Sequence, residues 1–468
     1  MRPRGSLVGP LVLILIGVLF LLRSLLPDFH IGEMFRLYWP YLLIAWGVLA
    51  LFEVIIRFAM GSPLPLSGIS GGGWVIVVLI CIAGLTSYEV MRPGTWWHNV
   101  GFERGFAAFG QEHDFSVTPQ QKSVGPAPHL VIERFRGDAK ITSSDSNEVS
   151  VSGHKEIRAF GDGDANKAND QTPVEVVQQG TTVIIRCNQD RADARTPVTT
   201  YLDITVPKGA SVEATGTYGD FDISGISGDV DVSSENAGVR FEDLGGSAKV
   251  ETRRSDLIRC VNVKGAVDLR GHGEDVELTN ITGPVTINGD YTGTVSLRQL
   301  AKPVRVSDIR TQLEIQQVPG EVRLERGSLS LQNIVGPLQL TTHATDVELN
   351  GVSNEVSMDV DKGDIELRPA HLPLGKMTIH TRSGNIEVAL PESAGFALNA
   401  YTERGEIDNE FGDQLREETQ GHGARLQGTI GNGPEVVLTT GRGTITVRKA
   451  NAEPVPAAKA AMLLYPVR

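Results

Sequence analysis

The sequence predicts a membrane-anchored all-β protein, in which an N-terminal three-helix transmembrane region precedes a β-solenoid, a parallel β-helix-like fold with about 18 residues per coil. Three observations predict this fold class. Apolar side chains recur about every nine residues over much of the chain, turn-forming residues lie between them, and three long apolar segments come before the polar part of the sequence.

The nine-residue spacing comes from triplets in which two apolar residues flank a third, as in Val276-Glu277-Leu278. In a β-strand such a triplet places both apolar side chains on one side and the middle side chain on the other. The spacing therefore predicts strands rather than helices. The triplets begin at Val212, Phe221, Val230, Val239, Ala248, Ile258, Val267, Val276, Val285, Val295, Val304, Leu313, Val322, Leu329, Leu338, Val347, Val356 and Ile365.

The segments between triplets are rich in Gly, Asn, Asp and Pro, as in Gly283-Pro284 and Asn288-Gly289-Asp290. These residues supply the positive or fixed φ angles that tight corners need. Two triplets and two corners make one coil, which buries its apolar side chains only by stacking on its neighbours. The alternative is a β-sandwich or a propeller, but propeller blades need roughly 40 residues each and sandwich strands are spaced less regularly.

Apolar segments at about residues 7–26, 37–56 and 74–90 predict transmembrane helices, because a bilayer core of about 30 Å needs about 20 apolar residues. The third segment is the shortest. A cleaved signal peptide is the alternative for the first, but the apolar run is long and no small-residue cleavage site follows it. The basic residues that flank these segments would lie in equal numbers on the two sides of the membrane. We expect a protein of the bacterial cytoplasmic membrane with its N-terminus in the cytoplasm. Three spans then place the C-terminal domain outside the cytoplasm. If the third segment is not a span, the C-terminal domain lies in the cytoplasm instead.

Strand-like alternation resumes after the apolar segments and predicts a cap for the exposed end of the solenoid. A polar loop is expected at Gly161–Thr172, and a longer loop at about Asp413–Leu426. The predicted organisation is a transmembrane region at 1–92, a juxtamembrane connector at 93–128, a β-strand capping region at 129–210, a β-solenoid repeat domain at 211–449 and a disordered tail at 450–468.

The polar part of the chain is acidic. The whole chain has a net charge of −13, and residues 101–468 hold 37 Lys or Arg against 52 Asp or Glu. This balance argues against nucleic acid as a partner. Cys81, Cys187 and Cys260 are far apart in the sequence, so they predict buried free thiols rather than a disulfide framework.

The sequence contains no recognisable catalytic or metal-binding motif. The histidines are scattered, and His371 and His380 are not at a ligand spacing. Asp162–Asn166 resembles the start of a calcium loop, but Lys167 occupies the glycine position and Pro173 the position of the bidentate glutamate. We therefore predict no catalytic residues, no cofactor and no metal site.

The polar middle residues of alternate triplets are expected to stack on one face of the rod. Glu277, Glu314, Glu348 and Glu366 are expected to fall on one such face. We take as a hypothesis that they form a docking stripe for a basic partner or for divalent cations. The alternative is a solvated face whose charges discourage sheets from stacking on one another.

Several motifs resemble those of a known family. Ser227–Val232, Ser383–Val388, Arg404–Asn409, Thr429–Gly433 and Gly443–Arg448 are similar to the small-Gly-Asp-Ile-x-Val element of the bacterial putative-adhesin, or toast-rack-like, repeat family, and the resemblance covers about residues 129–449. The apolar N-terminal region resembles that of LiaI/LiaF-like envelope-stress proteins, in Ile16–Leu19, Tyr38–Ile44 and Gly47–Leu49. Many Gly-Asp positions are replaced here, for example by Gly336-Pro337.

The resemblance implies a non-enzymatic, membrane-anchored cell-envelope protein that presents a rigid β-solenoid for adhesion or scaffolding. A second interpretation is an envelope-stress sensor or a modulator of a membrane kinase. A third is a polysaccharide-active β-helix enzyme, although such enzymes have longer loops and larger coils. The expected partners are the lipid bilayer and an envelope protein or polysaccharide.

Overall fold

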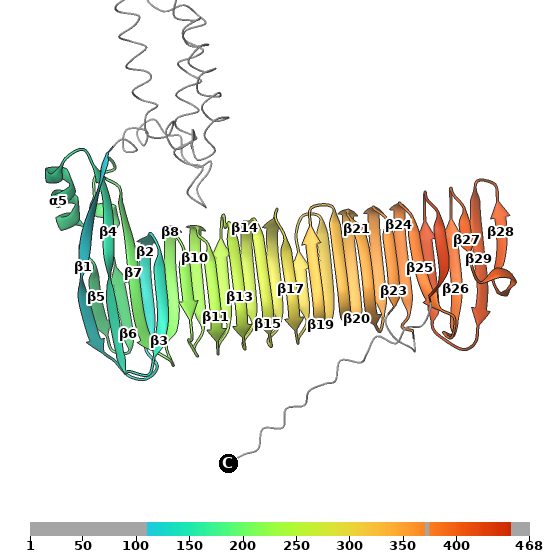
Figure 1. Cartoon of the computed structure of the whole chain (residues 1–468), viewed down its shortest axis with the longest axis horizontal. Coiled ribbons are helices and arrows are strands. Elements are labelled where there is room, and N and C mark those ends of the chain that lie inside the picture. Colours follow the sequence, from blue (N-terminus) through green and yellow to red (C-terminus); the bar gives the residue numbers. More distant parts are fainter. Residues whose placement is uncertain (1–109, 370–373, 451–468) are drawn as a thin grey trace, which may run out of the picture. The chain divides into compact units, whose positions relative to one another are not determined.

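The computed structural model describes residues 110–369 and 374–450, which form a rod of stacked coils (Figure 1). Strands of successive coils pair side by side along two faces, and these faces enclose one continuous apolar core. The strands form a single 31-stranded sheet, because β19 (Thr311–Glu325) and β20 (Ser328–Ala344) run across both faces. The predicted solenoid-like, all-β architecture is confirmed for these residues.

One of the two faces, face A, contains the strands that begin with β5 and end with β28. Their order in space differs from their order in the chain at both ends. The order is β5 (Glu175–Gln179), β6 (Thr182–Arg186), β2 (His129–Arg136), β8 (Ser211–Tyr218), β10 (Val230–Asn236), β12 (Ala248–Thr252), β14 (Val267–Gly273), β16 (Val285–Tyr291), β18 (Val304–Ser307), parts of β19 and β20, β22 (Val356–Lys362), β24 (Met377–Ser383), β30 (Glu435–Thr440), β26 (Phe396–Thr402), β29 (Gly423–Ile430) and β28 (Arg416–Gln420).

The other face, face B, contains the remaining strands. Their order is β1 (Gln111–Ser123), β4 (Glu148–Ala159), β7 (Val198–Pro207), β3 (Ala139–Ser144), β9 (Phe221–Ser224), β11 (Val239–Leu244), β13 (Leu257–Val263), β15 (Asp275–Ile281), β17 (Val295–Leu300), the other parts of β19 and β20, β21 (Asp346–Ser353), β23 (Ile365–Pro369), β25 (Ile386–Pro391), β31 (Ile445–Ala450) and β27 (Ile407–Asn409).

The register explains the nine-residue spacing of the sequence. On face A, Val230 pairs with Val212 of one neighbouring coil and with Ala248 of the other, and both pairings are parallel. Both apolar residues of each predicted triplet are buried, and the most exposed of them, Leu324, is only 8% exposed. Each fully buried Val, Leu or Ile stabilises the fold by roughly 1.5–3 kcal/mol relative to exposure. The prediction of inward-facing triplets is confirmed.

Polar residues next to the last residue of several strands of face B hold the corners together. Asp243, Asn262 and Asn280 adopt left-handed backbone conformations with φ of 56–58°, which Asn and Asp tolerate better than most residues. The Asn262 amide donates to Asp243 Oδ1 at 2.8 Å, and the Asn280 amide donates to Asn262 Oδ1 at 2.8 Å. The same side chains that allow the turn therefore also bond one coil to the next.

The aspartate of the Gly-Asp-Ile-x-Val element has a similar role at the opposite corner. The backbone N–H of Asp364 donates to Asp346 Oδ1 at 2.9 Å, and the backbone N–H of Asn385 donates to Asp364 Oδ1 at 2.7 Å. Asn385 Oδ1 in turn accepts from the Thr444 amide at 2.9 Å. Each of these side chains thus accepts a hydrogen bond from a backbone N–H next to the start of a strand in the neighbouring coil.

Substituting this acceptor is expected to weaken the stack. Asp364→Ala removes the side-chain acceptor of the Asn385 backbone N–H. It should therefore lower the free energy of unfolding by about 1 kcal/mol. Asp364→Asn keeps an acceptor oxygen and should change it by less than about 0.5 kcal/mol. Urea unfolding of the full chain followed by circular dichroism measures both. Equal effects of the two variants would contradict the assigned role.

The chain direction is reversed in one strand, β19, and returns to the original direction in β20. β19 runs antiparallel to β18 and to β17, and β20 runs antiparallel to β19 (Figure 1). The turn of this long hairpin contains Gly327, whose φ is +92°. Parallel stacking resumes where β20 pairs with β21 and β22. The prediction that all coils run in the same direction is therefore wrong for β19.

The N-terminal cap differs from the predicted boundaries. β1 is a strand of face B, although residues 93–128 were expected to form a connector. β2 and β3 form a regular coil between β6 and β8 and between β7 and β9, so residues 129–144 belong to the solenoid rather than to the cap. The expected polar loop at 161–172 is the helix α5 (Asp162–Gln171), and the cap also holds the 3-10 turn η1 (Gln189–Arg191).

The C-terminal cap repeats this arrangement. After β25 the chain forms β26 and β27, the 3-10 turn η2 (Gly412–Gln414) and the hairpin β28–β29, which corrects the loop expected at 413–426. The chain then returns, so that β30 lies between β24 and β26, and β31 lies between β25 and β27. The last coil in the sequence is thus not the last coil of the rod.

Two cysteines lie in the core as free thiols, as predicted. Cys187 and Cys260 are buried, and burial raises the pKa of each thiol to about 12. Such thiols are protonated at neutral pH and unreactive. Cys81 lies outside the described residues.

Within residues 110–369 and 374–450, no helix has both the length and the apolar character to cross a bilayer. The predicted spans at 7–26, 37–56 and 74–90 and the predicted tail at 451–468 fall outside those residues.

Candidate functional site

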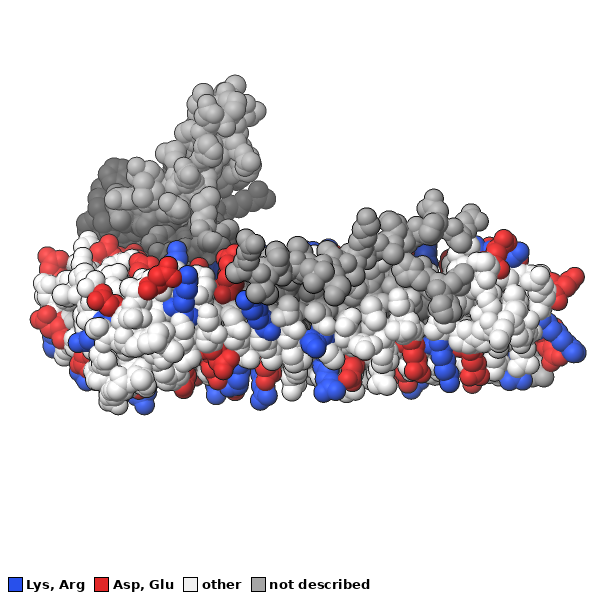
Figure 2. Space-filling view, turned by 90° about the horizontal axis from the view of Figure 1, so that it is seen from below, with Lys and Arg blue, Asp and Glu red and all other residues white. Residues whose placement is uncertain are grey.

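The outer surface of the rod is covered by charged side chains from neighbouring coils that pair with one another. Arg240 contacts Asp220 at 3.0 Å, Lys249 contacts Asp231 at 2.8 Å, and Arg298 contacts Glu321 at 2.8 Å. Figure 2 shows acidic and basic side chains interspersed along the rod rather than separated into large regions of one sign. Exposed ion pairs of this kind stabilise the fold only a little, typically by less than about 1 kcal/mol each. Their main effect is on which charges a binding partner contacts.

The predicted docking stripe is divided between the two faces. Glu277, Glu348 and Glu366 lie on face B, as expected. Glu314 lies on face A, where it stacks between Arg305 and Gln339, because β19 runs in the reverse direction. Its carboxylate contacts Arg305 at 2.9 Å. Placing Glu314 in the stripe was therefore wrong.

Face B carries a different row of three stacked glutamates, Glu348, Glu366 and Glu387, which we call the acidic row. These residues pair in register on β21, β23 and β25. Asn350 donates to Glu348 at 2.7 Å, Arg368 contacts Glu366, and Arg448 contacts Glu387 at 3.0 Å. Each carboxylate thus has a neighbour to one side and remains partly exposed to solvent.

Glu387 was not included in the predicted stripe, because the interruption at Pro369–Pro373 hides the stacking of β25 on β23 in the sequence. The signal was nevertheless present, since Ile386-Glu387-Val388 is a triplet of the same type as Ile365-Glu366-Leu367. Glu277 lies outside the acidic row, because Ser296, Arg323 and Ser330 separate it from Glu348. It contacts Arg259 at 3.5 Å.

A shallow, open hollow of about 350 Å³ lies where the coil direction reverses. Its lining includes Arg298 and Glu321, which form an ion pair with each other, and the corner residues Pro319 and Gly320. An acid or a base that is already neutralised by its neighbour is poorly placed for proton transfer. The hollow therefore gives no support to the enzymatic interpretation.

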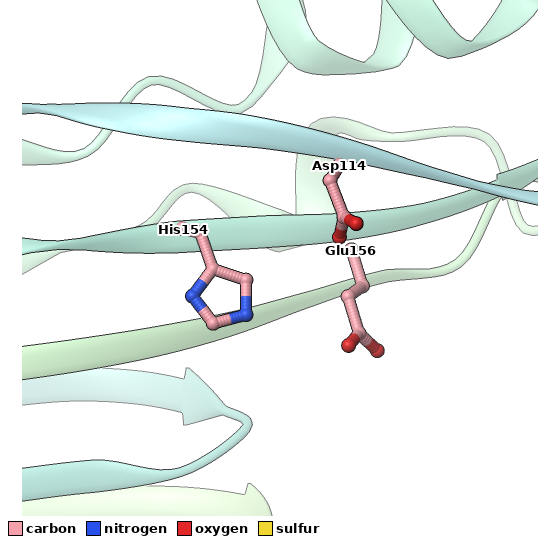
Figure 3. A group of neighbouring side chains, drawn as sticks. All are labelled: Asp114, His154 and Glu156. Carbon is pink, nitrogen blue, oxygen red and sulfur yellow. The ribbon is translucent and has the colours of Figure 1, made fainter.

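A second group of polar side chains lies on the N-terminal cap. Asp114 on β1 and His154 and Glu156 on β4 bring one nitrogen or oxygen atom each to within 4.8 Å of one another (Figure 3). The sequence analysis predicted no metal-ligating group. It missed this one because His154 and Glu156 are two residues apart on a strand, whereas Asp114 comes from a segment that was expected to be a connector.

The chain is similar to a known family and to solved structures. The family model described as Toastrack DUF4097 matches residues 129–448. No curated protein matches the chain. Two solved structures are similar: a putative cell adhesion protein from Clostridium sporogenes, with 10% identity and a TM-score of 0.17 over 71% of this chain and 99% of that one, and a putative adhesin from Bacteroides fragilis, with 11% identity and a TM-score of 0.17 over 70% and 96%.

The family match spans more than two thirds of the sequence and coincides with the solenoid, from the start of β2 into β31. It includes the Gly-Asp-Ile-x-Val corners whose carboxylates bond one coil to the next. The chain belongs to the Toastrack DUF4097 family.

Proposed function

We propose that this chain is a non-enzymatic cell-envelope protein that is anchored in the bacterial cytoplasmic membrane and presents its β-solenoid outside the cell membrane as an adhesive or scaffolding surface. The observation that carries the proposal is the rod itself. Its coils repeat the same outward positions over residues 129–450, so one face offers regularly spaced side chains rather than a single enclosed pocket. Such extended repeat surfaces suit binding to other macromolecules.

Three features of the chain support the individual parts of this proposal. The apolar segments at 7–26, 37–56 and 74–90 have the composition of membrane spans. The acidic row supplies a charged surface for a basic partner. Membership of the Toastrack DUF4097 family and the similarity to two proteins described as a putative cell adhesion protein and a putative adhesin agree with an adhesive role.

The topology of the full chain tests the membrane part of the proposal. A reporter that is active only in the periplasm and one that is active only in the cytoplasm are fused in turn after Arg468. Activity of the periplasmic reporter alone is the expected result. Activity of the cytoplasmic reporter alone would exclude adhesion and leave an internal scaffold or a signalling partner.

Charge reversal tests the acidic row. We expect Glu348→Lys, Glu366→Lys and Glu387→Lys together to reduce the retention of cells that display the full chain on a polylysine surface by about tenfold at low salt, because electrostatic attraction is reversed at one place. The matched control reverses Asp231, Asp268 and Glu314 on face A, which changes the net charge equally. Equal losses in the two triple variants, or no loss in the first, would contradict a docking role for the acidic row.

A further inference from the structure

The cap residues Asp114, His154 and Glu156 differ from the charged residues of the rod because their charges are not balanced. Asp114 lies directly opposite Glu156 in the antiparallel register of β1 and β4. Like charges opposite each other on neighbouring strands are destabilising. Neither carboxylate forms an ion pair with a lysine or an arginine of the described part of the chain, in contrast to the Asp231–Lys249 and Arg305–Glu314 pairs of the rod.

A third carboxylate adds to this imbalance. Glu112 lies two residues before Asp114 on β1, and its only ion pair within the described residues is with Arg158, at 4.0 Å. Burial raises the pKa of Glu156, and the neighbouring carboxyl groups of Glu112 and Asp114 raise it further, against the opposing effect of the Tyr201 hydroxyl. The cap therefore gathers three carboxylates around Glu156, and within the described residues Arg158, which pairs with Glu112, is the cation that forms an ion pair with any of them.

Two of the three side chains are held in place by Tyr201 on β7. Its hydroxyl donates to Glu156 Oε2 at 3.1 Å. Its ring stacks on the imidazole of His154, with ring centroids 4.6 Å apart and an angle of 11° between the planes. An outer group that fixes a ligand's orientation in this way is a usual feature of metal sites. In Figure 3 all three side chains extend from neighbouring strands toward the same region.

We propose that Asp114, His154 and Glu156 bind a divalent metal ion of the Zn²⁺ type. One imidazole nitrogen and two carboxylate oxygens form a mixed N/O set that suits Zn²⁺, whereas Ca²⁺ and Mg²⁺ prefer oxygen ligands alone. Tetrahedral ligands at about 2.0–2.1 Å from the ion lie roughly 3.3 Å apart. The ligand atoms lie within 4.8 Å of one another, so a modest rotation of the exposed Asp114 side chain toward His154 and Glu156 would close the site. Water completes the coordination.

The location of the site gives the ion a structural role. β1 is the outer strand of face B and pairs along one side with β4. An ion bound by Asp114 on β1 and by His154 and Glu156 on β4 links these two strands through their side chains. It thereby fastens the first described strand to the cap, next to the residues that lead toward the predicted membrane segments.

Isothermal titration of the purified full chain in detergent with ZnCl₂ tests the proposal. We expect saturable binding of Zn²⁺, and weaker binding of Ca²⁺ and Mg²⁺. His154→Ala and Asp114→Asn should each weaken Zn²⁺ binding at least about tenfold. The matched control is His343→Ala, because His343 contacts Asp361 at 2.5 Å on face A but has no third ligand in the described structure. This control should leave the affinity unchanged.

Hydrogen exchange supplies a second readout that does not depend on heat of binding. Added Zn²⁺ should slow the exchange of β1 amides in the full chain and in His343→Ala, but not in His154→Ala. Absence of Zn²⁺ binding, tighter binding of Ca²⁺, or equal losses in His154→Ala and His343→Ala would each overturn the proposal.

Discussion

Gly271→Ala is expected to lower the free energy of unfolding by more than about 4 kcal/mol, which is an exceptional effect for the addition of one methyl group. Gly271 lies at the end of β14 with a φ of +120°. A Cβ at this position would lie 1.6 Å from the carbonyl oxygen of Thr252 in the neighbouring coil. The oxygen is a backbone atom and the Cβ is fixed directly to the backbone, so the two cannot move apart while adjacent strands keep a spacing of about 4.8 Å.

The glycines of the chain provide controls that separate steric overlap from conformational strain. Gly327 also has a positive φ, of +92°, but its added Cβ meets nothing within 4 Å, so Gly327→Ala should cost about 1–2 kcal/mol. Gly163 in α5 is free of both problems, so Gly163→Ala should stabilise the helix by up to about 1 kcal/mol. Urea unfolding of the full chain measures all three variants. A Gly271→Ala effect no larger than that of Gly327→Ala would contradict the close approach of the coils.

Truncation after Asn432 is expected to unfold the C-terminal cap rather than merely shorten the rod. It removes β30 and β31, which lie between β24–β25 and β26–β27. The cap then loses the strands through which it pairs with the rod. It also loses the buried side chains of Val436, Leu438, Ile445 and Val447, each worth roughly 1.5–3 kcal/mol.

Hydrogen exchange of the truncated chain measures this effect. Amides of β26 and β29 should exchange nearly as fast as in an unfolded chain, while those of β12 to β16 should keep their protection. Truncation after Ala450 is the control and should leave both regions protected, because all strands remain. A protected β26 in the shorter chain would mean that β24 and β26 can pair directly, and that the last coil is dispensable.

The repeat was predictable because burial acts on every coil in the same way. A triplet such as Leu313-Glu314-Ile315 must point its apolar side chains inward in either chain direction. For the same reason the triplets could not reveal the reversal at β19, since an apolar-polar-apolar pattern reads identically forward and backward. Glu314 was consequently assigned to the wrong face, although its outward orientation was correct.

The helix α5 was not predictable, because its sequence has little helical preference. It consists largely of Asp, Asn and Gly, which favour turns over helices. Its stability comes from the surrounding structure: Ala165 and Ala168 are buried, and the Lys155 amine donates to the carbonyls of Asn169 and Thr172 at the C-terminal end. These contacts join segments that no local pattern connects.

The candidate metal site could be predicted only in part. A histidine and a glutamate two residues apart on a strand point to the same side, so His154 and Glu156 were detectable as a pair. Asp114 is brought beside them by the pairing of β1 with β4. That pairing was not foreseen, because β1 was expected to be a connector, and the third ligand was therefore absent from the sequence analysis.

The insertion of the last coil between two others affects how the rod responds to mechanical force. Tension applied to the chain at Ala450 acts along β31, which is bonded to β25 on one side and to β27 on the other. Pulling β31 out must break its hydrogen bonds to both neighbours, whereas removing an edge strand breaks its bonds to one neighbour only. Tension from the N-terminal side instead first reaches β1, which pairs with β4. The rod is thus expected to yield first at the end where the proposed metal ion lies.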